Sequence, residues 1–90
     1  MAHNDLTKLI KKLDSIKKKI KIGDKYFHYK HPDQIYQIIK IGIIEETEKI
    51  CVIYEALYGE KIVWVRSLED FSSKVKLENG DEVDRFTKVE

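Results

Sequence analysis

The sequence predicts a mainly β fold with one N-terminal α-helix, in which short strands form a small antiparallel SH3-like barrel or a strongly bent sheet. Apolar residues recur at intervals of three and four over residues 5–21, which is the spacing of an amphipathic helix. Further along, five or six short runs of branched and aromatic residues alternate with turn signals. Ninety residues make a single domain, so we assign residues 1–22 to an amphipathic basic helix and residues 23–90 to a small β-barrel domain.

The helix expected over residues 5–21 has a start, an end and one apolar face. Asn4 or Asp5 can cap its first turn, and Gly23 is a suitable stop. Lysines crowd its last turns, where cations complement the helix dipole. We predict that the apolar stripe is buried, on the barrel or against a second chain. The stripe consists of Leu6, Leu9, Ile10, Leu13, Ile16 and Ile20.

The strands are separated by recognisable turns. His31-Pro32-Asp33 is expected to turn because proline withdraws a backbone donor, and Gly42 indicates a bulge or bend. Gly59-Glu60 and Asn79-Gly80 each predict a hairpin, and Ser67 can cap a single helical turn. The predicted strands are Tyr26–Lys30, Gln34–Ile44, Lys49–Tyr58, Lys61–Arg66, Val75–Leu77 and Glu82–Val89.

The formal net charge of +1 conceals an asymmetry. Residues 1–22 contain seven lysines and two aspartates, a net of +5, so the remaining ten Lys+Arg and fourteen acids leave residues 23–90 at −4. The acidic part is unlike a dedicated phosphate-backbone binder. The basic helix can attract nucleic acid or an acidic protein, although a solvated helix face explains the same lysines.

The sequence indicates a cytoplasmic protein without a membrane span. No run of about 18 apolar residues and no signal-peptide segment is seen. Cys51, the only cysteine, lies in an apolar strand and is expected to be a buried, inert thiol. His3, His28 and His31 do not form a convincing metal set, and no glycine-rich phosphate loop is present. We therefore expect no metal and no cofactor.

Several motifs follow one another between residues 23 and 89. They are Tyr26-x-His28-Tyr29-Lys30, Ile35-Tyr36, Gly42, Val52-Ile53-Tyr54-x-Ala56-Leu57-Tyr58-Gly59, Trp64-Val65-Arg66-x-Leu68-x-x-Phe71 and Arg85-Phe86. In this order they resemble domain-of-unknown-function family 1653, a group of small bacterial proteins. The resemblance implies a compact β-rich domain and no established activity.

Three positions depart from the pattern of that family. Ser67 and Asp84 stand where the family usually has proline, and Glu46 stands where it commonly has histidine. The missing histidine weakens any mechanism that needs that side chain. The helix of residues 1–22 lies outside the shared core.

Aromatic and long polar side chains are interleaved within the predicted strands. On a strand, Tyr26, His28 and Lys30 share one face and can line a polar groove. Phe27 and Tyr29 then take the other face as core residues. The alternatives are an exposed strand face, and aromatic rings that only pack in the core. The candidate ligand-binding residues are Tyr26, His28, Lys30, Tyr54, Tyr58, Trp64, Arg66 and Arg85.

Glu55 interrupts an otherwise apolar strand face. A buried carboxylate needs a partner because an unpaired buried charge is very costly. Arg66 and Arg85 are the only arginines, so we predict a structural ion pair of Glu55 with one of them. The alternative is an arginine that presents its guanidinium to an anionic ligand.

These patterns favour a non-enzymatic binding module whose ligand is an anionic or nucleotide-like group, nucleic acid or a peptide. One alternative is an enzyme or accessory domain that acts on a nucleotide-like small molecule, with His28 as the acid or base. Another is an adaptor that uses the N-terminal helix to bind a partner protein or a second copy in a homodimer.

Overall fold

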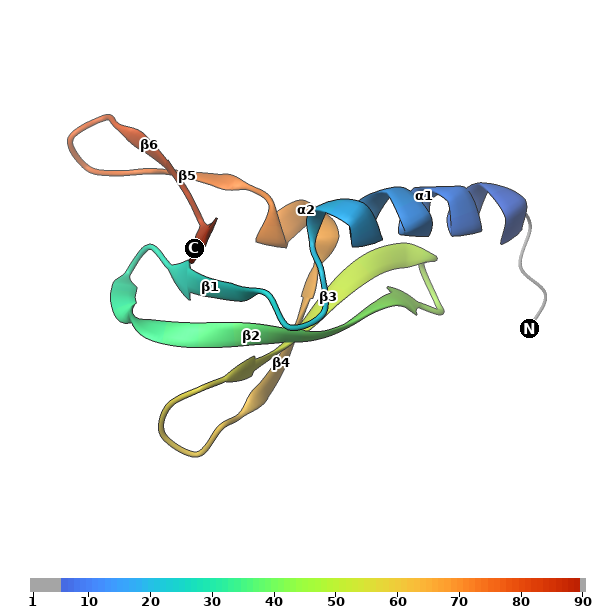
Figure 1. Ribbon diagram of the computed structural model, residues 1–90. Coiled ribbons are helices and arrows are strands. Elements are labelled where there is room, and N and C mark those ends of the chain that lie inside the picture. The colour runs from blue at the N-terminus through green and yellow to red at the C-terminus, as the bar shows by residue number, and fades with distance from the viewer. Residues whose placement is uncertain (1–5, 90) are drawn as a thin grey trace.

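The computed structural model describes residues 6–89, which are organised around a five-stranded antiparallel sheet (Figure 1). The strand order is β4-β3-β2-β1-β7, and β5 and β6 form a separate two-stranded hairpin. The helices are α1 (Leu6–Lys19) and α2 (Leu68–Phe71). The strands are β1 (Lys25–His28), β2 (His31–Ile44), β3 (Lys49–Ala56), β4 (Val63–Ser67), β5 (Lys74–Lys76), β6 (Glu82–Asp84) and β7 (Phe86–Lys88). Within residues 6–89, no helix is long and apolar enough to cross a membrane.

The five-stranded sheet is open. Its outermost strands, β4 and β7, do not pair with each other. The predicted mainly β fold with an N-terminal helix is confirmed, whereas a closed SH3-like barrel is not formed. A physical reason is the length of β7, which at three residues offers too short an edge for closure.

A β-bulge in β2 determines which side chains reach the core. Ile38 and Ile41 are both buried, although residues three apart on a regular strand face opposite sides of a sheet. The register with β3 shifts between Ile38 and Lys40, and the extra residue turns both isoleucines toward the same face. Gly42, where we expected the bulge, pairs directly with Cys51. The bulge therefore lies a few residues earlier than predicted.

The turn between β1 and β2 also comes earlier than predicted. His28 pairs with His31, so Tyr29 and Lys30 form the connection, and residues 31–33 already belong to β2. The register shifts between Phe27 and His28, and this irregularity accommodates Pro32 without a regular ladder hydrogen bond.

Two other predicted connections are confirmed. The hydroxyl of Ser67 accepts a hydrogen bond from the backbone N–H of Asp70 at 3.2 Å and caps α2. Gly80 has a φ of 93°, which glycine adopts without strain, and it closes the β5–β6 hairpin after Asn79.

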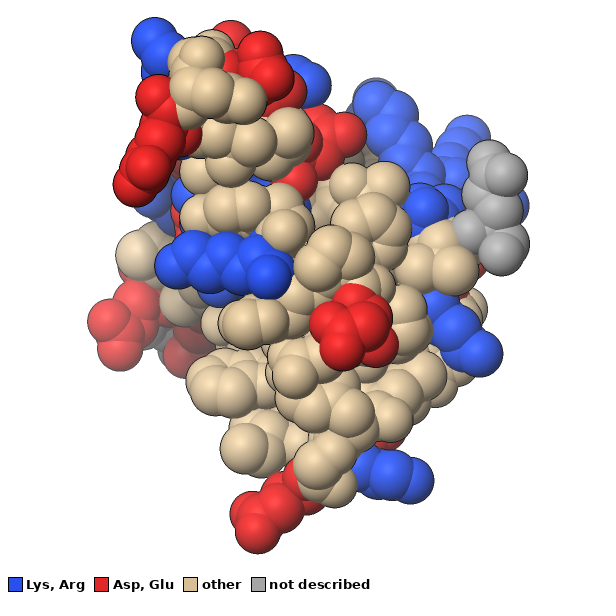
Figure 2. All heavy atoms as spheres, turned by 90° about the vertical axis from the view of Figure 1, so that its left-hand side faces the viewer, with Lys and Arg blue, Asp and Glu red and all other residues tan. Residues whose placement is uncertain are grey.

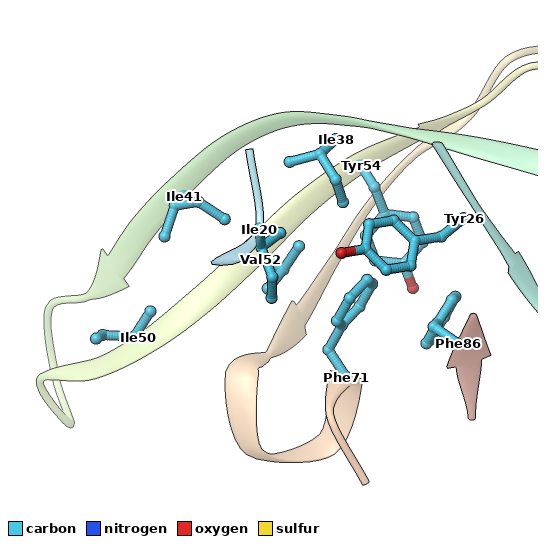
Figure 3. Close-up of a cluster of buried hydrophobic side chains, with 9 residues drawn as sticks. All are labelled: Ile20, Tyr26, Ile38, Ile41, Ile50, Val52, Tyr54, Phe71 and Phe86. Carbon is cyan, nitrogen blue, oxygen red and sulfur yellow. The ribbon is translucent and has the colours of Figure 1, made fainter. Parts of the chain in front are cut away.

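The core lies on one face of the sheet (Figure 3). Aliphatic side chains fill the part near α1, and aromatic rings fill the part near α2 and β7. Phe71 stacks on Phe86 with ring centroids 4.4 Å apart and an interplanar angle of 11°. The buried cluster consists of Ile20, Tyr26, Ile38, Ile41, Ile50, Val52, Tyr54, Phe71 and Phe86. Cys51 is also buried, as its apolar neighbours predicted.

The two faces of β1 are exchanged relative to the prediction. Tyr26 is only 8% exposed and contacts Phe71 edge-to-face, whereas Phe27 is half-buried on the opposite face. Tyr26 pairs with Tyr36 of β2, and cross-strand partners share a face. The face of β1 that reaches the core is thus set by β2, which the sequence of β1 alone does not reveal.

Helix α1 is attached mainly by its C-terminal end. Ile20, just beyond the helix, is buried, and Leu13 and Ile16 pack against the core. Leu6 and Ile10 are more than half exposed. The predicted burial of the stripe is therefore confirmed for its second half. In the first half Leu9 is half-buried and Leu6 and Ile10 are exposed, and burial against a second chain stays a prediction. The predicted caps Asn4 and Asp5 lie outside the described residues.

Candidate functional site

A pocket of about 250 Å³ opens at the aromatic end of the core, where it is lined by residues of all five strands of the sheet and of the β1–β2 turn. The core-facing sides of these strands supply its wall, and the β1–β2 turn supplies its rim. Its lining contains cationic side chains and aromatic rings together with two histidines. The lining residues are His28, Lys30, His31, Tyr36, Tyr54, Trp64, Arg66 and Phe86.

The aromatic wall is an interlocked set of rings. Tyr36 and Tyr54 meet edge-to-face with centroids 5.3 Å apart, and Phe86 contacts Tyr54 at 5.4 Å. Trp64 faces the same side as its cross-strand partner Tyr54, and it is 48% exposed. A half-exposed indole at the pocket can offer its exposed surface to a flat group.

Arg66 provides the central cation of the pocket. It donates to Asp70 at 2.7 Å and to the hydroxyl of Tyr54 at 3.3 Å. Its guanidinium also lies over the ring of Phe86, 5.4 Å from the centroid. Burial lowers the pKa of Arg66, but the hydrogen bonds to Tyr54 and Asp70 outweigh that effect and leave the pKa raised. The guanidinium is thus fixed in place and charged.

His28 lies among these cations and is held neutral. Burial lowers the pKa of His28 below its ordinary value, and the charges of Arg66, Arg85, Lys30 and His31 lower it further. Its Nδ1 accepts a hydrogen bond from the backbone N–H of Lys30 at 3.3 Å, which requires that this nitrogen carry no proton. An anion in the pocket would offset the neighbouring positive charges and favour protonation of His28.

Tyr36 links the pocket to Tyr58 at the end of β3. The two hydroxyl oxygens are 2.6 Å apart, and either can donate. Burial raises the pKa of Tyr36 to about 12, with a further contribution from the hydrogen bond to Tyr58. Tyr36 therefore remains a neutral phenol at physiological pH and can offer a hydrogen bond to an anionic or carbonyl oxygen.

The structure brings together five of the eight predicted ligand-binding residues. The other three have different places: Tyr26 is in the core, Tyr58 is bonded to Tyr36, and Arg85 donates to Ser73 at 2.9 Å. Arg85 still acts on the pocket through its charge, which lowers the pKa of His28. The five that line the pocket are His28, Lys30, Tyr54, Trp64 and Arg66.

The predicted ion pair of Glu55 is wrong. Arg66 pairs with Asp70, and the Nε of Arg85 lies 3.9 Å from the same carboxylate. Arg66 lies opposite Val52 on the core face of the sheet, whereas Glu55 lies opposite Val63 on the other face. Glu55 is also only half-buried, so hydration replaces the partner that full burial would require.

Three lining residues were missed as site residues. Tyr36 and Phe86 were named only as members of the motifs, and His31 was assigned to a turn. The alternation of β2 could have indicated the position of Tyr36. Residues two apart on a strand share a face, and Tyr36 lies two residues before the buried Ile38. Phe86 follows a bend at Arg85, where the chain passes from the β5–β6 hairpin into β7 of the main sheet, and no local pattern predicts this change.

A larger hollow of about 520 Å³ lies between α1 and the start of β3 and α2. Its floor includes Ile16, Ile20 and Ile50, and exposed charged side chains such as Lys12 and Glu69 form its rim. This is the gap under a helix that is attached at one end. It lacks the convergence of fixed polar groups seen around His28.

Within residues 6–89, no group of three His, Cys, Asp or Glu side chains is placed to hold a metal ion. His28 and His31 both line the pocket, where they face Arg66 and Lys30. Cations of this kind repel a metal ion and attract an anion. His3 lies outside the described residues.

The fold and the pocket define a small open-sheet β domain with a cationic, aromatic pocket at one end of its core. Comparison of the sequence with known families gives a match over residues 24–88. The chain belongs to the family described as protein of unknown function (DUF1653). The resemblance drawn from the order of the motifs is therefore confirmed, and α1 lies outside the matched region.

A solved structure agrees with this assignment. The crystal structure of a protein belonging to DUF1653 from Bordetella bronchiseptica is similar, with a TM-score of 0.64 and 26% sequence identity. The similarity covers 80% of this chain and 90% of that chain. No curated protein matches the chain.

Proposed function

We propose that this protein is a non-enzymatic binding module, and that the pocket around His28 takes a small anionic ligand with a flat ring, of the nucleotide type. The observation that supports it is the convergence of Arg66 and Lys30 with the exposed indole of Trp64 in one hollow. Cations recognise phosphate or carboxylate, and an indole face recognises a flat ring. Residues that meet both requirements of such a ligand line the same pocket.

The size of the pocket limits the ligand. A volume of about 250 Å³ is below the roughly 300–1,000 Å³ of typical drug-sized sites. It accommodates one ring or one anionic group at a time, with the rest of the ligand outside, along Trp64. A mononucleotide meets this condition, and so does a single nucleotide of a longer strand. An acidic peptide would satisfy the cations and leave the ring contact unused.

The lining favours binding over catalysis. His28 is the group that an enzyme would use as acid or base, and its lowered pKa disfavours the protonated form that a general acid needs. Its neighbours in the pocket are cations and aromatic rings, which hold a ligand in place. Asp70, the carboxylate nearest to Arg66, is already engaged in the ion pair.

An NMR titration of the full chain tests the proposal. The probes are adenosine monophosphate, a short RNA and an acidic peptide, each added to isotopically labelled protein. We expect adenosine monophosphate to shift the Trp64 indole signal and the amides near His28 and Lys30. Lys30→Gln should weaken this binding several-fold, because it removes a cation from the pocket rim.

The matched control is Lys25→Gln. Lys25 belongs to the same strand as His28 but is exposed away from the pocket, and the substitution removes the same charge. Its affinity should stay close to that of the parent. Shifts confined to the lysines of α1, or equal losses in the two variants, would refute the pocket and point to non-specific attraction by the basic helix.

A further inference from the structure

Strand β4 is an outermost strand of the sheet, and its free edge carries unpaired backbone groups (Figure 1). The backbone N–H of Ala56 donates to the carbonyl of Ile62 at 3.0 Å, which sets the hydrogen-bonding phase of the β3–β4 ladder. Alternate residues of an antiparallel ladder point their backbone groups toward the partner strand. Ile62, Trp64 and Arg66 therefore bond toward β3, while the N–H and C=O groups of Val63 and Val65 point outward.

The same edge is apolar on both faces. Ile62 and Trp64 are about half exposed on the pocket side, and Val63 and Val65 are 50% and 62% exposed on the other side. Figure 2, which views the side of the molecule that includes the β3–β4 hairpin, shows uncharged side chains over most of its middle and charged ones mostly at its margins. Four successive apolar residues on a free edge are unusual in a monomer.

The other outer strands of this fold are protected from pairing with another chain by their short length or by charged residues. β7 is three residues long and ends in Lys88, which is exposed. The β5–β6 hairpin carries an exposed charged residue at each end of both strands. Short length and charge prevent pairing with another chain. β4 is longer than these strands, and its one charged residue, Arg66, lines the pocket, so its outer edge is open to pairing with another strand.

We propose that β4 pairs antiparallel with β4 of a second copy of this chain, joining two five-stranded sheets into one. With Trp64 opposite Trp64 of the second copy, Val63 and Val65 exchange backbone hydrogen bonds with Val65 and Val63 across the two-fold axis. This register uses the outward-pointing groups of both strands. It also brings the four exposed apolar side chains beside apolar side chains of the second copy.

The residues of β4 are compatible with a second copy as the occupant. In this register Arg66 lies opposite Ile62 of the second copy, and Lys61 lies opposite Ser67, so no like charges oppose each other. An isologous interface of this kind needs a self-complementary surface. The two Trp64 side chains meet beside the two pockets, so each copy adds an aromatic wall to the ligand site of the other. The dimer does not depend on the identity of any ligand.

Sedimentation velocity of the full chain over a range of concentrations tests the proposal. The parent protein should form dimers at tens of micromolar. Val65→Pro removes only an outward-pointing N–H, so it spares the ladder with β3. Val63→Lys places a charge on the edge. Each substitution should weaken dimerisation at least tenfold and keep the β-sheet circular dichroism spectrum.

The control is Thr87→Lys, which adds the same charge at the opposite edge of the sheet and should leave the dimer unchanged. Two results would overturn the proposal. One is a parent protein that stays monomeric at the highest soluble concentration. The other is a dimer that survives Val65→Pro and Val63→Lys but is lost in Leu6→Lys, which would assign the contact to the exposed half of α1.

Discussion

Replacement of Phe71 by alanine is expected to lower the free energy of unfolding by about 3–5 kcal/mol, the usual cost of removing a buried phenylalanine. Phe71 is 3% exposed, stacks on Phe86 and contacts Tyr26 at its edge. It is the last residue of the four-residue α2, so its ring anchors that helical turn over the sheet. A small domain has only about 5–15 kcal/mol of stability, and this one substitution removes a large share of it.

Denaturant unfolding of Phe71→Ala and Phe27→Ala measures the effect against a matched control. Both substitutions remove the same atoms, but Phe27 is half-buried on the opposite face of the sheet. Phe27→Ala should cost clearly less than Phe71→Ala. Equal losses would contradict the placement of the core on the face that carries Tyr26 and Phe71.

Arg66→Gln is expected to reduce the affinity for adenosine monophosphate at least tenfold, or about 1.4 kcal/mol. Glutamine lacks the positive charge that attracts an anion. It also lacks the guanidinium that Tyr54 and Asp70 hold in place. Because the Arg66–Asp70 pair is partly exposed, the cost in stability should be only about 1 kcal/mol. The protein should therefore remain folded while binding is lost.

Calorimetric titration of three variants separates charge from geometry. Lys76→Gln removes an exposed cation from the distant β5–β6 hairpin and should bind like the parent. Arg66→Lys keeps the charge without the planar fork, so its affinity should fall between those of the parent and Arg66→Gln. If Arg66→Gln binds as tightly as Lys76→Gln, the guanidinium has no part in the site.

The sequence predicted those parts of the fold that depend on local chemistry. The N-cap at Ser67, the Asn79-Gly80 hairpin and the amphipathic period of α1 all rest on residues close to one another along the chain. The buried face of β1 depends instead on the register with Tyr36, and the open sheet depends on the length of β7. These are relations between distant segments, which local patterns do not encode.

In the candidate site, too, the sequence predicted what depends on local chemistry and missed what depends on contacts between strands. His28, Trp64 and Arg66 were singled out because aromatic and long polar side chains are interleaved in the predicted strands, and all three line the pocket. Glu55 was noted because it interrupts an apolar strand face, yet it lies on the opposite face from Arg66. The strand parity of Glu55 was predicted correctly. The predicted ion pair failed because Glu55 and Arg66 lie on opposite faces of the sheet. Which residues of β3 and β4 share a face depends on the register between the two strands.

The NMR-measured pKa of His28, in the free protein and with saturating adenosine monophosphate, tests the central claim most directly. The free value should lie below the ordinary value of about 6.5, because burial and the charges of Arg66, Arg85 and Lys30 disfavour a proton there. A bound anion offsets those charges, so the pKa of His28 should rise when the nucleotide binds. A pKa of His28 that does not change when the nucleotide is bound would contradict the assignment of this pocket as the ligand site.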